Sequence, residues 1–223
     1  MQSSNPFHER VLHWLERFSL LGATVLLLAV ALGLTFPALH SWMPAGLLIT
    51  TPASALGLLL SSAAAITDLT PRGARRKVCL MAGLGVILLS QLAMHLNGAS
   101  GNADAWIPAA WTTPMSMSTM AGLALVLLGL VCQRWQPHSL EHELSVALLL
   151  SLCVFLTAGY LLDDHDIVDP RVWLRTGEWT LSSLWLIALV LFTQLGSRSS
   201  GECSELHRVK RRWSALGRVI SGD

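Results

Sequence analysis

The side chains best suited to chemistry lie in one short acidic segment of the chain. Asp163, Asp164, His165 and Asp166 are consecutive, and Asp169 follows three positions later. Carboxylate and imidazole groups are ligands for divalent cations, so this cluster predicts a candidate metal site. The alternative, which we favour, is a solvated acidic loop, because the segment lacks the glycine and the terminal glutamate of an EF-hand.

Two histidines form a second candidate site. His95 lies near one end of an apolar segment, and His40 lies just beyond the corresponding end of another. Two histidines at one membrane level can ligate a haem or sense pH. The alternative, which we favour, is that each hydrogen-bonds at the membrane interface. Trp106 and Trp111 follow His95 and are candidate ligand contacts, although tryptophan in such a loop is typical of interfacial anchoring.

Other polar and sulfur-bearing residues indicate packing rather than catalysis. Met115, Met117 and Met120 suit copper or a flexible apolar ligand, but ordinary packing is the simpler interpretation. We expect the polar groups within the apolar segments to bond across helices. These groups are Gln91, Gln194, Ser90, Thr157 and Thr193. The sequence contains no Ser-His-Asp grouping, HExxH, P-loop or GxGxxG, so we predict no enzyme and no catalytic residue.

The elements that must position these residues are long apolar runs. Hydrophobic residues make up 52% of the chain and charged residues 13%, about half the charge of a soluble domain. Such runs predict transmembrane helices, because lipid cannot satisfy exposed backbone groups. The six predicted spans cover approximately residues 18–36, 46–66, 78–96, 115–132, 144–162 and 180–195. A net charge of +1 gives no indication of nucleic-acid binding.

The basic residues predict the orientation of these spans. Of the 15 Lys and Arg residues, only Arg171 and Arg175 fall on one side, and the others fall on the side of both termini. The positive-inside rule then places both termini in the cytoplasm. The expected divisions are a cytoplasmic segment 1–17, a six-helix domain 18–196 and a basic amphipathic tail 197–223. In this interpretation the connection between the second and third spans is the loop 67–77.

A loose internal repeat divides the spans into three hairpins. Each returning span begins with small hydroxyl residues, in segments 50–56, 115–121 and 179–184. Ser and Thr cap helix starts, and small residues allow helices to approach closely. The repeat predicts an all-α membrane protein built by threefold duplication of a helical hairpin.

Residues 115–130, MSMSTMAGLALVLLGL, carry a family resemblance. They resemble the N-terminal membrane sensor regions of bacterial histidine kinases and diguanylate cyclases, whose returning helices read roughly Met-Ser-Pro-x-Thr-Ala before a Leu-rich run. The fifth span, which ends in TAGY at 157–160, is similar to spans of those regions. The resemblance covers roughly 18–195 and implies a sensory role in a bacterial inner (cytoplasmic) membrane. After 195 the sequence shows no kinase, cyclase or phosphoacceptor segment, so the chain is either an excised sensor or works through a partner.

These observations predict a sensory or signal-relay module in the lipid bilayer. We expect a homodimer, or a signalling partner bound through 197–223, and no cofactor, with haem or a divalent cation as the alternatives. The first alternative function is an accessory or assembly subunit of a larger membrane complex. The second is a haem-binding redox protein or a small-molecule transporter.

Overall fold

The computed structural model describes most of the apolar part of the chain as α-helix. The described residues are 6–36, 50–67, 71–96, 114–135, 140–162 and 177–195. Within these ranges every regular element is a helix and none is a strand. The prediction of an all-α protein is confirmed for this part of the chain.

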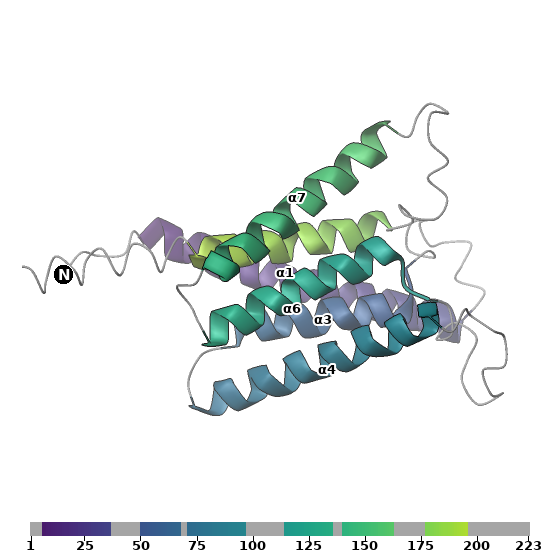
Figure 1. Ribbon diagram of the computed structural model, residues 1–223, viewed down its shortest axis with the longest axis horizontal. Helices are drawn as coiled ribbons and strands as arrows, with labels where there is room; N and C mark the ends of the chain where they lie inside the picture. The colour runs from purple at the N-terminus through teal and green to yellow at the C-terminus, as the bar shows by residue number, and fades with distance from the viewer. Residues whose placement is uncertain are drawn as a thin grey trace, which may run out of the picture.

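Five of the helices are long and apolar enough to cross a membrane, which is the composition expected of a multi-pass membrane protein. Only α3 is shorter. The helices are α1 (Pro6–Thr35), α3 (Pro52–Ile66), α4 (Pro71–Leu96), α6 (Met117–Trp135), α7 (Leu140–Leu162) and a last helix, Glu178–Leu195. The last helix is the unlabelled yellow-green ribbon of Figure 1.

Several helix boundaries differ from the spans expected from hydropathy, beginning with the first two helices. The first helix begins at Pro6 and continues through position 18 without a break. The segment expected as 46–66 is helical from Pro52, because proline occupies the first turn and the Thr51 hydroxyl accepts from the Ser54 amide. Residues 46–49 lie outside the described part of the chain.

Successive helices run in opposite directions and lie side by side (Figure 1). Helices α1, α4 and α7 run one way, and α3, α6 and Glu178–Leu195 return. The returning helices are the more buried set. Of the residues in the most apolar stretch, 39% are buried in α6 and 44% in Glu178–Leu195, against 17–28% in α1, α4 and α7. The returning helices therefore form the centre of the bundle.

The short helix α3 is surrounded by protein. Its 15 residues rise about 22 Å, less than the roughly 30 Å of a hydrocarbon core. It contacts α1, α4 and α6, and most of its residues are buried. A helix so covered exposes little backbone to lipid at its ends, so its length is compatible with a position inside the bundle.

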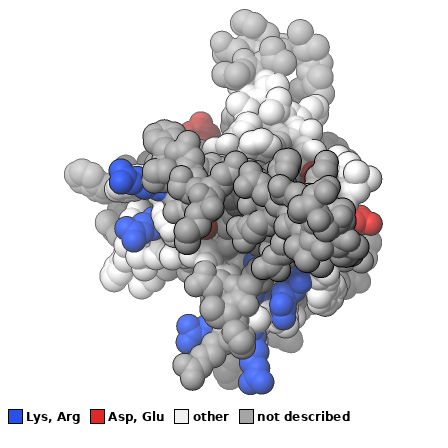
Figure 2. All heavy atoms as spheres, turned by 90° about the vertical axis from the view of Figure 1, so that its left-hand side faces the viewer, with Lys and Arg blue, Asp and Glu red and all other residues white. Residues whose placement is uncertain are grey.

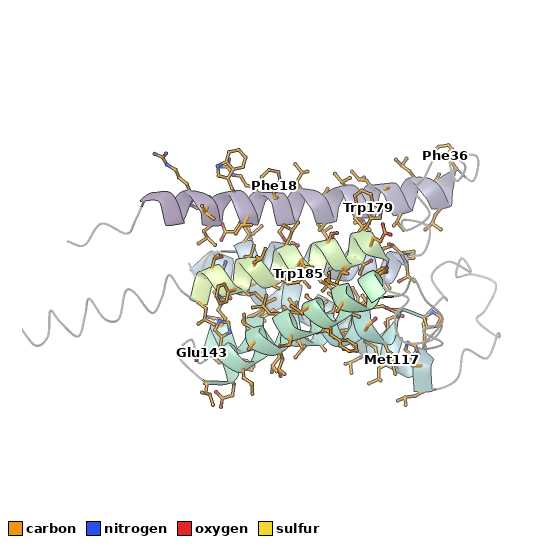
Figure 3. The ribbon with its side chains drawn as sticks, turned by 90° about the horizontal axis from the view of Figure 1, so that it is seen from above. Phe18, Phe36, Met117, Glu143, Trp179 and Trp185 are labelled. Carbon is orange, nitrogen blue, oxygen red and sulfur yellow. The ribbon has the colours of Figure 1, made fainter. Side chains whose placement is uncertain are left out.

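Helices α1, α4 and α7, which run opposite to the returning helices, present apolar side chains to the exterior. On α1, Trp14 and Phe18 stack with ring centroids 5.6 Å apart, and both are more than half exposed. Phe18 and Phe36 point away from the other helices (Figure 3). Exposed aromatic and aliphatic side chains on this face suit contact with lipid.

The returning helices share one register. The carbonyls of Thr51, Ser116 and Gly177 each accept the first helical hydrogen bond, from the residue four positions later. Counted from these three residues, the third and seventh positions are buried in every helix. They are Ser54, Thr119 and Thr180, then Leu58, Leu123 and Leu184. The common pattern is the structural counterpart of the repeat in the sequence.

The register brings a glycine of α3 against a leucine of α6. A Cβ atom added at Gly57 would lie 2.7 Å from Cδ1 of Leu123 and 3.6 Å from Cδ1 of Leu84. Both leucines are 0% exposed, so the Leu123 methyl group would have to shift within the packed interior. The close approach of α3 and α6 therefore depends on the absence of a side chain at Gly57.

Gly57→Ala is expected to lower the free energy of unfolding in detergent by about 1 kcal/mol through overpacking. The matched control is Gly85→Ala, whose Cβ would lie 3.9 Å from Leu127 Cδ2. Because alanine favours a helix over glycine, the control should be neutral or stabilising by about 0.5–1 kcal/mol. Thermal unfolding of both variants tests this, and shifts of the same sign and size would contradict it.

Candidate functional site

A buried amine begins a row of polar side chains that crosses the bundle. Lys77 of α4 is 1% exposed, and its Nζ donates to Oε1 of Gln133 on α6 at 2.6 Å. Gln133 Nε2 in turn donates to Oε1 of Gln194 on the last helix at 2.8 Å. These three side chains join three helices through consecutive hydrogen bonds.

Gln194 extends the row to two further helices. Its Nε2 donates to Oε1 of Glu16 on α1 at 3.1 Å and to the carbonyl of Ala65 on α3 at 3.0 Å. Glu16 also lies 3.4 Å from Nδ1 of His13, one turn earlier on α1. We call Lys77, Gln133, Gln194 and Glu16 the Lys77 chain; it joins α4, α6, the last helix and α1 directly, and α3 through its backbone.

Helical periodicity places Lys77 inside the bundle. The buried positions of α4 include Gly73, Ala74, Lys77, Met81 and Leu84, which recur at helical spacing on one face. An amine on this face is costly unless it is hydrogen-bonded, and intramembrane ionisable groups are functional candidates for that reason. The Lys77 chain is therefore the leading candidate site among the described residues.

The repeat explains why two glutamines meet. Gln133 and Gln194 each lie seventeen positions after the residue whose carbonyl accepts the first hydrogen bond of their helix, Ser116 and Gly177. Because the two helices are in the same register, both amides come to the same level of the bundle. An amide both donates and accepts, so the pair passes the hydrogen-bonded row from one helix to the next.

The Lys77 chain lies at the basic end of the molecule, which we call the Lys77 end. Figure 2 views this end, and Lys and Arg side chains lie around its edge. Every Lys and Arg whose side chain the structure describes belongs to it: Arg10, Arg17, Arg75, Arg76, Lys77 and Arg134. In this part of the chain the opposite end carries no Lys or Arg, so the charge is strongly one-sided.

At the opposite end, α4 holds the start of α6. The Met115 amide donates to Oε1 of Gln91 at 2.7 Å, and the Met115 carbonyl accepts from Nε2 of His95 at 2.8 Å. Gln91 is 3% exposed and Met115 is 0% exposed. We call Gln91, His95 and the Met115 peptide group the Met115 clamp. It provides hydrogen-bond partners for both the backbone N–H and the backbone C=O of this buried residue.

The clamp gives the His95 ring a defined bond. A carbonyl only accepts, so Nε2 carries the proton. Ligation of a haem or metal through Nε2 would require this bond to break. Haem ligation by His95 stays a prediction, and in the structure Nε2 is occupied by its hydrogen bond to the Met115 carbonyl.

Most of the other predicted site residues lie outside the described part of the chain. They are His40, Trp106, Trp111, Asp163, Asp164, His165 and Asp166. Among the residues that the structure describes, no group of three or more His, Cys, Asp or Glu side chains could hold a metal ion. The predicted acidic metal site and the predicted ligand contacts therefore stay predictions.

The prediction of cross-helix bonding holds for some polar groups and is wrong for others. Gln91 and Gln194 bond to other helices or their entry segments, and Thr157 Oγ1 accepts from Trp185 Nε1 at 2.9 Å. Ser90 and Thr193 instead donate to carbonyls of their own helices. A short hydroxyl reaches its own preceding turn more easily than a neighbouring helix.

Three members of the Lys77 chain, Lys77, Gln133 and Glu16, were missed by sequence reasoning. Glu16 falls in the segment 1–17, which was expected to lie outside the six-helix domain. The connection 67–77 was expected to be a loop, whereas α4 begins at Pro71 and makes Lys77 helical. Proline suits the first helical turn, which explains the early start. Gln133 falls just beyond the expected span 115–132 and was not singled out. The spacing of Gly73, Ala74 and Lys77 is the signal that would have placed Lys77 on the inner face.

The described residues form a helical bundle whose composition is compatible with a multi-pass membrane protein and whose helices are joined by hydrogen bonds near both ends. Comparisons with protein-family models, with curated proteins and with solved structures found no match for this chain.

Proposed function

We propose that the chain is a six-span sensory or signal-relay module of a bacterial inner membrane, arranged as three hairpins, with the Lys77 end in the cytoplasm. The one-sided basic charge supports this orientation, because Lys and Arg favour the cytoplasmic side. The short helix α3 then acts as the second span, shielded from lipid by its neighbours. Such a role requires no catalysis by the chain.

The observation that carries the proposal is the position of Gln194 in the Lys77 chain. Gln194 bonds to α1, α3 and α6, and it lies one residue before the last helix ends at Leu195. The basic segment 197–223 follows directly. A rearrangement of any of these helices therefore changes the contacts of a residue that lies just before this segment in the sequence.

Hydrogen-bond networks of this kind suit switching. A buried network is stable when every bond is made and costly when it is partly broken, so intermediate arrangements are disfavoured. A stimulus that binds one packing arrangement better than another shifts the population between them. The proposed relay runs from the helices through Gln194 into 197–223 and from there to a cytoplasmic partner.

A fusion protein tests the relay. A diguanylate cyclase domain joined after Asp223 gives an output that can be measured as cyclic dinucleotide in membranes. Gln194→Ala should change the basal output roughly tenfold, the effect of about 1.4 kcal/mol on a two-state equilibrium. The matched control is Thr193→Val, because Thr193 bonds only within its own helix in the described contacts.

The fusion experiment can contradict the proposal directly. If Gln194→Ala and Lys77→Ala both fold, reach the membrane and leave the output unchanged, the Lys77 chain does not relay packing changes to the tail. The alternative role of an assembly subunit would then gain support. Mass spectrometry of proteins that co-purify with the native chain would identify the complex.

A further inference from the structure

The outer face of α1 carries two arginines on either side of a tryptophan. Arg10, Trp14 and Arg17 are all exposed, and Trp14 lies four residues after Arg10 and three residues before Arg17. Residues at these spacings are neighbours on the surface of a helix, with Cβ atoms about 5–6 Å apart. Both guanidinium groups are therefore within reach of one small ligand beside the indole ring. We call these three residues the Trp14 site.

The apolar length of α1 places the Trp14 site at the level of lipid headgroups. The helix has no charged residue from Phe18 to Thr35, and this stretch rises about 27 Å, close to the roughly 30 Å of a hydrocarbon core. The Phe18 ring stacks on Trp14 and points away from the other helices (Figure 3). When this stretch spans the hydrocarbon, the two arginines lie among the phosphate groups of the adjoining leaflet.

The described side chains leave the positive charge of the site uncompensated. Among the described side chains of α1, Glu16 is the one carboxylate, and its Oε1 accepts from Gln194 of the last helix at 3.1 Å. The Glu16 side chain is only 15% exposed, so the Lys77 chain holds this carboxylate against the bundle. Neither guanidinium of the site forms an ion pair within the described part of the chain. Two exposed positive charges therefore face the surroundings of α1.

We propose that the Trp14 site binds the phosphate of an anionic phospholipid. Guanidinium groups bind phosphate through charge-assisted, often paired hydrogen bonds, and two of them match a headgroup of net negative charge. A zwitterionic headgroup also carries an ammonium group, which the same arginines repel. Beyond Phe18 the face continues with the exposed side chains of Leu21, Val25 and Leu28, which provide a surface for the acyl chains. A free phosphate ion lacks this second contact.

The other exposed arginine pair at the Lys77 end lacks this arrangement. Arg75 and Arg76 of α4 are consecutive, and consecutive residues on a helix do not face each other. No aromatic residue lies three or four positions from either of them. This pair has the same charge and lies at the same end of the molecule, so it provides a matched control.

Native mass spectrometry of the full chain in mild detergent tests the proposal. The probes are phosphatidylglycerol, which is anionic, and phosphatidylethanolamine, which is zwitterionic. The unsubstituted chain should bind phosphatidylglycerol more tightly. The double variant Arg10→Gln, Arg17→Gln should weaken this binding roughly tenfold, or about 1.4 kcal/mol. The control Arg75→Gln, Arg76→Gln removes the same charge and should change the binding less than twofold.

A third variant separates the arrangement of the site from its charge. Trp14→Leu keeps both arginines and an apolar side chain between them, but it removes the indole face on which a guanidinium can rest. Phosphatidylglycerol binding should weaken about threefold in this variant. Unchanged binding would mean that the arginines act without the tryptophan, contrary to the proposed site.

Three further results would overturn the proposal. The first is an equal loss of phosphatidylglycerol binding in the two double variants, which would indicate general attraction to basic residues. The second is equal binding of the two lipids by the unsubstituted chain. The third is full displacement of phosphatidylglycerol by excess inorganic phosphate, which would show that the acyl chains contribute nothing. The inference rests on the proposed membrane location of α1 and not on signalling, so failure of the cyclase fusion would leave the Trp14 site standing.

Discussion

Lys77→Ala is expected to lower the free energy of unfolding by roughly 3 kcal/mol. A hydrogen bond to a charged group contributes about 1.5–3 kcal/mol, and removal of the amine also leaves the buried Gln133 oxygen without this donor. The buried alkyl stem adds packing contacts that alanine lacks. Thermal or denaturant unfolding in mild detergent measures the change.

The matched control for this experiment is the preceding residue. Arg76 is exposed on the same turn of α4, and Arg76→Ala should change stability by less than about 0.5 kcal/mol. Equal destabilisation by the two substitutions would mean that loss of basic charge, rather than loss of the bond to Gln133, is responsible. It would remove the structural basis for treating the Lys77 chain as a unit.

Gln133→Leu should destabilise the protein by about 3 kcal/mol although it nearly preserves volume. The substitution removes the acceptor of the Lys77 bond and the donor to Gln194 at once, and each lost partner costs about 1–3 kcal/mol. The same unfolding measurement applies. The expected cost exceeds that of Gly57→Ala, because polar groups as well as packing are affected.

A double variant separates the network from simple packing. Replacing both partners by apolar groups is often nearly neutral, so Lys77→Met should recover part of the loss caused by Gln133→Leu. The coupling between the two substitutions should be about 0.5–3 kcal/mol. Strictly additive losses would show that Lys77 and Gln133 act independently, contrary to the 2.6 Å bond between them.

Hydropathy was sufficient to predict the helical architecture but not where each helix begins. The apolar runs predicted the helices because lipid-compatible segments leave the backbone no other way to satisfy its hydrogen bonds. The start of α4 was misplaced because basic residues near a helix end have the composition of a loop. Charge alone does not distinguish Arg75 and Arg76, which are exposed, from Lys77, which is buried; that distinction depends on helical phase.

The hydrogen-bond partners of the polar side chains could not be predicted from the sequence, because they depend on how the helices pack. Gln194 was expected to bond across helices, and it does, but its contacts with Glu16 and Gln133 join residues 178 and 61 positions apart. His95 could be placed near a membrane interface, whereas its bond to the Met115 carbonyl depends on how α6 enters the bundle. Such contacts follow from the arrangement of helices, which local patterns do not determine.

The long separations within the Lys77 chain also impose an order on biosynthesis. Gln133 is 56 residues downstream of Lys77, so at about 5–20 residues per second roughly 3–11 s pass before this partner is made. Glu16 can form its hydrogen bond with Gln194 only after synthesis has nearly reached the end of the described part of the chain. Helices that enter the membrane early therefore remain incompletely assembled until the last one arrives. The helix Glu178–Leu195 completes the Lys77 chain. A ribosome that stalls before this helix would therefore leave a bundle without one of its most buried helices. Membrane quality control could recognise such an incomplete bundle.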